Sequence, residues 1–152
     1  MIERRHALTA LKIRLPILFL ETTVREHIEN TVGRTPPESG GILGGQEGRV
    51  TRFFFDKNAQ TTRLSYRPSL RTLNPELKRW SAEGVMFMGV LHSHPMGDHL
   101  SPGDICYARK ILTKNPGLRY VDMLLLSPDT HGKLKGRRVT RRGERKLSIR
   151  YR

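Results

Sequence analysis

The sequence has a single cysteine and no long apolar run. Cys106 has no second cysteine with which to form an internal disulfide, so we expect a cytoplasmic protein. No stretch approaches the roughly 20 consecutive apolar residues of a membrane-spanning helix, so we expect no membrane association. The six-residue run from Leu15 to Leu20 follows Arg4 and Arg5. It is too short for a secretory signal and lacks a small-residue cleavage site after it, so we interpret it as a strand.

Acidic residues are scarce relative to basic ones. The chain has 14 Asp and Glu against 28 Lys and Arg, a net charge of +14, which favours acidic partners. Ten of the basic residues and a single acid, Glu144, lie between 131 and 152. This basic segment lacks the interleaved aromatic residues that stack on nucleic-acid bases. We therefore favour a solvated strand or tail, with contact to nucleic acid as the alternative.

Internal repeats, low-complexity tracts and long linkers are also missing. A chain of 152 residues is long enough to bury one hydrophobic core and too short for two ordinary domains. We expect residues 1–152 to form a single domain that includes the basic segment 131–152.

Helical apolar spacing recurs in three places. We expect helices over residues 23–32, 74–83 and 101–113. Thr23 and Glu26 have the spacing of a capping box, and Gly33 follows as a stop signal. Asn74 is the expected N-cap of the second helix, with Pro75 at its first position.

Between the helices lie apolar segments typical of strands. We expect strands over residues 15–20, 38–45, 50–55, 85–91 and 120–126, with one or two more in the basic segment. Glu47-Gly48 is the expected hairpin turn. The near-continuous apolar run 85–91 predicts a strand buried on both faces, with Met86 and Met88 in the core. This order predicts an α/β (α+β) fold in which helices pack on a mixed sheet.

The most informative residues follow the run 85–91. Side chains two apart on an extended strand point to the same face, so His92 and His94 can direct both imidazoles at one point. A turn of six residues leads to Ser101, and Asp104 lies on the first turn of the next predicted helix. Two histidines and one carboxylate are a ligand set of catalytic zinc, which keeps a fourth position for water. We expect His92, His94 and Asp104 to bind one Zn²⁺ ion.

Hydrolysis at such a site needs further groups. Zinc lowers the pKa of a bound water to about 7, but a general base must still take a proton from it. Glu38, at the start of the glycine-rich strand, is the candidate base, and it would later deliver the proton to the leaving amine. Ser101 is the candidate donor of a hydrogen bond to the oxyanion that forms during attack.

Each of these residues also has a purely structural explanation. Ser101, Pro102 and Asp104 are typical of a helix N-terminus. A histidine at a strand end is usually structural, and a lone glutamate such as Glu38 is most often a surface charge. The two interpretations are compatible, because a helix cap can also position a metal ligand.

The combination resembles the JAMM signature of the MPN+ (JAB domain) zinc metalloproteases. The residues that carry the resemblance are His92-Ser93-His94-Pro95, Ser101 and Asp104, with the upstream Glu38 and Gly40-Gly41-Ile42-Leu43-Gly44. The order of elements from Thr23 to Leu126 is similar as well. The resemblance implies an MPN-like curved mixed sheet flanked by helices and a metalloprotease that uses one catalytic zinc.

The resemblance also implies a role for each residue and a class of substrate. By position, His92, His94 and Asp104 are ligands, Glu38 is the acid and base, and Ser101 stabilises the tetrahedral intermediate. The implied reaction is cleavage of peptide or isopeptide bonds at the C-terminus of ubiquitin-like proteins. The compact chain is similar to the small prokaryotic branch, whose substrates are ubiquitin-like or sulfur-carrier proteins.

The turn between His94 and Ser101 departs from the family pattern, which usually has one residue more. Asp98 and His99 lie in this turn and are alternative ligands. His6, His27 and His131 have no partner at ligand spacing, so we expect them to be ordinary surface or core histidines.

Two other functions fit part of the sequence. A non-catalytic MPN scaffold would bind a partner. Such scaffolds typically lack metal ligands, whereas the predicted metal ligands are all present in this sequence. A nucleic-acid-associated protein resembling the RadC branch would fit the positive charge. That branch usually has Asn where this chain has Ser93, and it carries a helical N-terminal extension that has no counterpart here.

Overall fold

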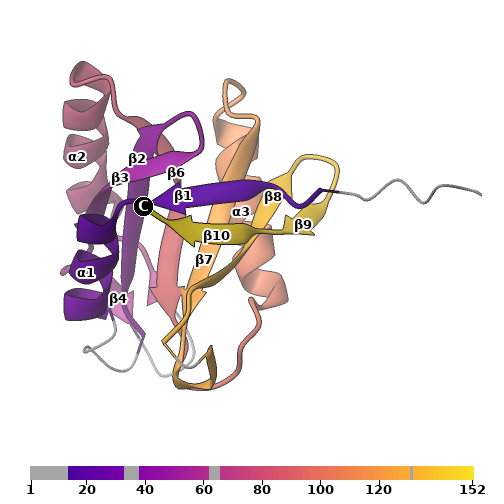
Figure 1. Cartoon of the computed structure of the whole chain (residues 1–152). Helices are drawn as coiled ribbons and strands as arrows, with labels where there is room; N and C mark the ends of the chain where they lie inside the picture. Colours follow the sequence, from indigo (N-terminus) through magenta and orange to yellow (C-terminus); the bar gives the residue numbers. More distant parts are fainter. Residues whose placement is uncertain (1–13, 33–37, 62–65, 131) are drawn as a thin grey trace, which may run out of the picture.

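The computed structural model describes residues 14–32, 38–61, 66–130 and 132–152 (Figure 1). In chain order the elements are β1 (Ile17–Leu20), α1 (Thr22–Thr31), β2 (Gly40–Gln46), β3 (Arg49–Phe55), β4 (Gln60–Thr61), β5 (Tyr66–Arg67), α2 (Leu70–Ala82), β6 (Met86–Ser93), α3 (Pro102–Lys114), β7 (Tyr120–Leu126), a short 3₁₀ helix (Pro128–Thr130), β8 (Lys135–Thr140), β9 (Glu144–Lys146) and β10 (Ser148–Tyr151).

One mixed sheet organises the described part of the chain. Its eight strands run in the order β10-β1-β3-β2-β6-β7-β8-β9, and β4 and β5 form a separate two-stranded ribbon. β6 lies near the middle, antiparallel to β2 and parallel to β7. β9 and β10 stand at opposite ends of this order, although only Leu147 separates them in the chain, so the sheet curves until its ends approach each other (Figure 1). The predicted curved mixed sheet is confirmed.

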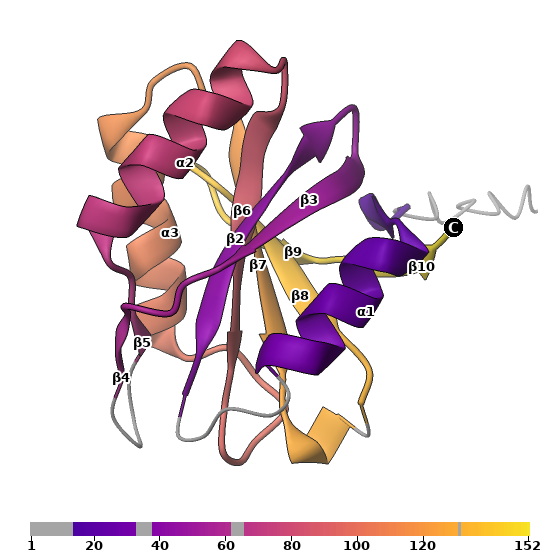
Figure 2. The ribbon, with the colours of Figure 1, turned by 90° about the vertical axis from the view of Figure 1, so that its left-hand side faces the viewer.

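Helices cover both faces of the sheet (Figure 2). α1 packs Val24 and Ile28 into the larger core cluster on one face. α2 and α3 lie on the opposite face, where α2 buries Trp80 and α3 packs on Val90 of β6. His92, two positions after Val90, therefore faces α3, which is the geometry that the ligand prediction needs.

The predicted start of α1 is wrong in detail. The helix begins at Thr22, its N-cap is Glu21, and no side chain in the described ranges caps it. Thr23 and Glu26 lie inside the helix and form no capping box. The predicted stop at Gly33 lies outside the described residues.

α2 begins earlier than the sequence predicts. Its N-cap is Ser69, so Asn74 and Pro75 lie within the helix and not at its start. The reason is a tertiary contact: Asp56, at the end of β3, accepts a hydrogen bond from the Ser69 backbone N–H at 2.8 Å. This bond satisfies a donor that the first turn would otherwise leave unpaired.

The strand predictions are confirmed with one error in the core. Glu47 and Gly48 form the hairpin turn between β2 and β3, both with positive φ, at 51° and 75°. Met88 is buried as predicted, but Met86 is 63% exposed. Met86 is the first residue of β6, at the end of the strand.

The basic segment contains strands and not a free tail. β8 pairs with β7, β9 pairs with β8, and β10 pairs in parallel with β1. The positive charge is therefore carried by strands that complete the sheet. None of the helices in the described ranges is long and apolar enough to cross a membrane.

Candidate metal centre

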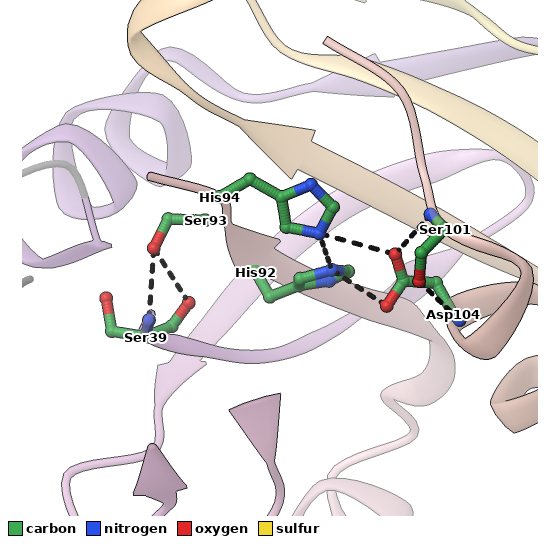
Figure 3. Close-up of polar contacts among 6 residues, drawn as sticks. All are labelled: Ser39, His92, Ser93, His94, Ser101 and Asp104. Atoms are coloured by element: carbon green, nitrogen blue, oxygen red, sulfur yellow. Dashed lines mark hydrogen bonds and ion pairs between the residues drawn. The ribbon is translucent and has the colours of Figure 1, made fainter. Parts of the chain in front are cut away.

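Three side chains converge at the carboxyl end of β6 (Figure 3). His92 lies in β6, His94 directly follows the last residue of β6, and Asp104 lies on the first turn of α3. The Nε2 atoms of the two histidines are 2.9 Å apart. Asp104 places Oδ1 3.1 Å from Nε2 of His92 and Oδ2 3.3 Å from Nε2 of His94. The structure thus brings together the three residues that the sequence predicts as ligands.

The end of β6 is held by the start of β2. Ser93 donates its backbone N–H to the Ser39 carbonyl at 2.8 Å. The Ser39 N–H donates to Ser93 Oγ at 3.0 Å (Figure 3). Gly40 pairs with His92 in the sheet. A Cβ atom at Gly40 would lie 2.3 Å from the Leu91 carbonyl oxygen, so only glycine permits this close approach.

Asp104 combines the structural and the ligand-like role. It forms a capping box with Ser101: the Asp104 N–H donates to Ser101 Oγ at 3.1 Å, and the Ser101 N–H donates to Asp104 Oδ2 at 2.7 Å. The box fixes the carboxylate in the orientation that faces both imidazoles. The cap therefore positions Asp104 and does not turn it away.

The donor atoms suit a zinc ion. A tetrahedral ion with bonds of about 2.0–2.2 Å holds neighbouring ligand atoms about 3.3–3.6 Å apart. The two Nε2 atoms lie 2.9 Å apart, and each lies 3.1 or 3.3 Å from a different oxygen of Asp104, so the separations here are similar or shorter. If both imidazoles donated a proton to Asp104, two N–H groups would oppose each other at 2.9 Å. A shared cation resolves this conflict, because all three groups then act as electron-pair donors.

The electrostatics keep the carboxylate charged. Burial alone would raise the pKa of Asp104, but hydrogen bonds from His92 and His94 outweigh it and hold that pKa far below its usual range. The hydrogen bond to Asp104 raises the pKa of His94 despite partial burial. A metal ion must therefore displace a proton from His94, so metal affinity is expected to fall in acid.

Glu38 lies beside the cluster. It is 5% exposed and directly precedes Ser39, and continuing the register of β2 and β6 places it opposite His94. Burial raises its pKa, and electrostatic interaction with His94 and His92 offsets only part of that rise. A carboxyl group whose pKa is raised toward neutrality is suited to exchange protons at physiological pH.

Ser101 is exposed at the entrance to α3. Its oxygen accepts the capping hydrogen bond from Asp104, and its hydroxyl proton remains available for donation. Ser101 is thus hydrogen-bonded to one member of the predicted ligand cluster, Asp104.

The alternative ligands lie outside the cluster. Asp98 pairs with His99 at 3.1 Å and with Lys135 at 2.8 Å, and His99 is largely exposed. His27 lies exposed on α1, with its ring edge against Phe53. His6 and His131 lie outside the described residues.

The short turn after His94 is fixed by its own contacts. Ser127 Oγ donates to the Gly97 carbonyl at 2.6 Å, and the Gly97 N–H donates to the Asp129 carboxylate. The turn is therefore held against the loop that follows β7, and one residue fewer does not separate Asp104 from the histidines.

One neighbour of the centre could not be predicted from the sequence. The ring of Tyr66, in β5, stacks on the ring of His92 with centroids 6.0 Å apart and an interplanar angle of 7°. Tyr66 belongs to no recognisable motif and is 26 positions from His92, so no local signal could have identified it.

Comparisons with known proteins identify the family and the fold. Residues 20–134 match the sequence family described as prokaryotic homologues of the JAB domain. Protein DSY2949 from Desulfitobacterium hafniense has a similar solution structure, with a TM-score of 0.70 and 20% identity over 89% of this chain and 92% of that one. AF2198, a JAB1/MPN domain protein from Archaeoglobus fulgidus, has a TM-score of 0.53 and 14% identity over 88% of this chain and 98% of that one.

No curated protein sequence matches the chain significantly. The two solved structures establish the fold, and the family match covers more than half of the chain. The chain belongs to the family of prokaryotic JAB-domain homologues.

Proposed function

We propose that this protein is a zinc-dependent metallopeptidase or isopeptidase of the JAMM type. The observation that carries the proposal is the convergence of His92, His94 and Asp104, with all three separations at or below 3.3 Å. The buried Glu38 beside them supplies a proton-accepting group. A set of ligands alone would fit a structural metal site, whereas an open ligand set with an adjacent buried carboxyl fits hydrolysis.

Zinc at this site would lower the pKa of a water molecule to about 7 and polarise the carbonyl under attack. Glu38 takes the proton from that water and passes it to the leaving amine. The raised pKa of Glu38 favours the first transfer, because a less acidic carboxyl group is a stronger base, and it keeps the proton bound until the amine accepts it. Asp104 and the two imidazoles keep their positions through the capping box and the end of β6.

Ser101 donates a hydrogen bond from its hydroxyl to the oxyanion that develops on the attacked carbonyl. The hydroxyl is suited to this because the capping bond uses an acceptor site of the oxygen and leaves its proton free. One residue thus caps α3 and stabilises the intermediate.

The proposed substrates are ubiquitin-like or sulfur-carrier proteins. The extended C-terminal tail of such a protein can lie along a strand and present its last peptide or isopeptide bond to the site. A net charge of +14 would favour association with acidic partners.

The test is hydrolysis of ubiquitin-like and sulfur-carrier proteins that carry a C-terminal peptide extension, by wild type and by Glu38→Gln. We expect the substitution to lower the rate of hydrolysis by about 10²–10⁴-fold while zinc content stays the same, because only the proton transfer is lost. Glu26→Gln, at an exposed position on α1, is the matched control and should keep full activity. Equal rates in Glu38→Gln and wild type would contradict the mechanism. A zinc-loaded wild type without activity on any of these substrates would favour a non-catalytic scaffold.

A further inference from the structure

His92 lacks the hydrogen bond that usually orients a metal-binding imidazole. Such histidines generally donate the proton of their second ring nitrogen to a carbonyl or carboxylate, which fixes the tautomer and the ring orientation. Nδ1 of His92 is buried and has no hydrogen-bond partner in the described part of the chain. The orientation of this ring must therefore depend on packing.

Tyr66 provides that packing. Its ring lies parallel to the imidazole, and the centroid distance of 6.0 Å is within the range of favourable offset stacking. Tyr66 also packs against the cluster that contains Val90, two residues before His92 in β6. The stacked ring restricts rotation of the imidazole out of its plane.

Tyr66 is in turn held by Asp56. The tyrosine hydroxyl donates to Asp56 Oδ2 at 3.4 Å, and Asp56 is 3% exposed. The Asp56 N–H donates to the Gly40 carbonyl at 2.9 Å, and Gly40 pairs with His92. Burial raises the pKa of the Tyr66 hydroxyl, so it remains a donor at any physiological pH. The tyrosine is thereby fixed to the same pair of strands that carries the histidine.

We propose that Tyr66 is a positioning residue for the metal centre: its ring, anchored through Asp56, holds the His92 imidazole with Nε2 toward His94 and Asp104. This inference rests on the proposed zinc function. It assigns Tyr66 no contact with reacting atoms, because the residue acts through His92.

The test measures zinc affinity by competition with a chromophoric chelator, and the visible absorption spectrum of Co²⁺-loaded protein. Tyr66→Phe keeps the ring and removes the hydroxyl, and Tyr66→Leu removes the ring. Phe87→Leu is the matched control, because Phe87 packs against the same cluster and, within the described ranges, stacks on no imidazole.

We expect Tyr66→Leu to weaken zinc binding by about 10-fold or more and to change the cobalt spectrum, as loss of an orienting neighbour does. Tyr66→Phe should remain within about 2-fold of wild type, since it preserves the stacking. Phe87→Leu should lower the melting temperature and leave both metal readouts unchanged. If Tyr66→Leu and wild type had the same zinc affinity and cobalt spectrum, this inference would be overturned and the proposed function would stand. A wild type that binds no zinc would overturn the proposed function and this inference together.

A second measurement needs no destabilising variant. Nuclear Overhauser effects between the ring protons of Tyr66 and His92 are expected in the wild type. The Tyr66→Phe variant should show the same effects from its phenyl ring, because the substitution preserves the stacking. Absence of these effects from the folded wild type would also overturn the inference.

Discussion

Asp104 uses one carboxylate for two purposes, and this explains why the site forms from so short a segment. The capping box fixes its rotamer through the α3 backbone, and the same two oxygen atoms face the imidazoles of His92 and His94. Pre-positioning of a ligand by a helix cap reduces the side-chain entropy that metal binding would otherwise cost. The structural explanation of Asp104, which the capping box confirms, is therefore compatible with its proposed role as a ligand.

Glu38 illustrates the opposite case, a residue whose position lowers stability. A carboxyl group whose pKa is raised in the folded state binds its proton more tightly there than in the unfolded state. Stability is then unaffected below the ordinary glutamate pKa of about 4.3 and decreases as pH rises through the folded-state pKa.

Glu38→Gln should therefore raise the melting temperature of the metal-free protein near neutral pH. The difference from wild type should disappear as the pH is lowered below about 4, because both side chains are then neutral. Scanning calorimetry across this pH range in the presence of a chelator measures it, with Glu26→Gln as the control that changes nothing. A Glu38→Gln variant no more stable than wild type at neutral pH would contradict the burial of an ionised Glu38.

At the scale of elements, the sequence predicts well the strands and helices that depend on residues close together in the chain. β6 follows from a continuous apolar run, and α3 follows from its start at Ser101 and its apolar positions Ile105, Ala108 and Leu112. The predicted ligands came together because strand periodicity and a helix start are both local signals.

What the sequence did not predict depends on contacts between distant residues. α2 begins before Asn74 because Asp56 accepts from the Ser69 N–H, and these two residues are 13 positions apart. Stacking of Tyr66 on His92 likewise requires that β5 fold back over β6. The apolar neighbours of Met86 predict a core residue, but the residue begins β6 and its side chain is exposed.

The last two strands offer a test at this scale. Leu147, which joins β9 to β10, is 5% exposed and belongs to the same core cluster as Leu18 and Leu20 of β1. β10 is also the parallel partner of β1 over four residue pairs.

We expect Leu147→Ala to lower the free energy of unfolding by about 2–5 kcal/mol. Deletion of residues 144–152 should lower it further, because the deletion also removes the strand that pairs with β1. Urea denaturation measures both, and Arg150→Ala, an exposed change in β10, should stay within about 0.5 kcal/mol of wild type. If the truncated chain unfolded at the same urea concentration as the full chain, the basic segment would be an appendage and not part of the sheet.

For the whole molecule, positive charge and fold are connected. Part of the basic excess is used internally: Arg138 of β8 forms two hydrogen bonds of 2.8 Å with the buried Asp122 and lies over the Tyr120 ring. A buried carboxylate requires such a partner, since an unpaired one would be strongly destabilising. Sequence-based charge counting therefore overestimates the charge that is free to meet a partner.

The curved sheet and the packing of α3 upon it together bring the end of β6 to the first turn of α3. The central claim is that this arrangement binds zinc through His92, His94 and Asp104. Each ligand contributes one donor atom, so removal of one leaves two and should abolish tight binding.

Metal analysis of the purified protein tests this claim most directly. We predict about one zinc per wild-type chain and loss of that zinc in His94→Ala, which leaves the capping box of α3 intact. His99→Ala should keep its zinc, because His99 pairs with Asp98 away from the centre. A wild type without zinc, or zinc retained equally in His94→Ala, would contradict the account.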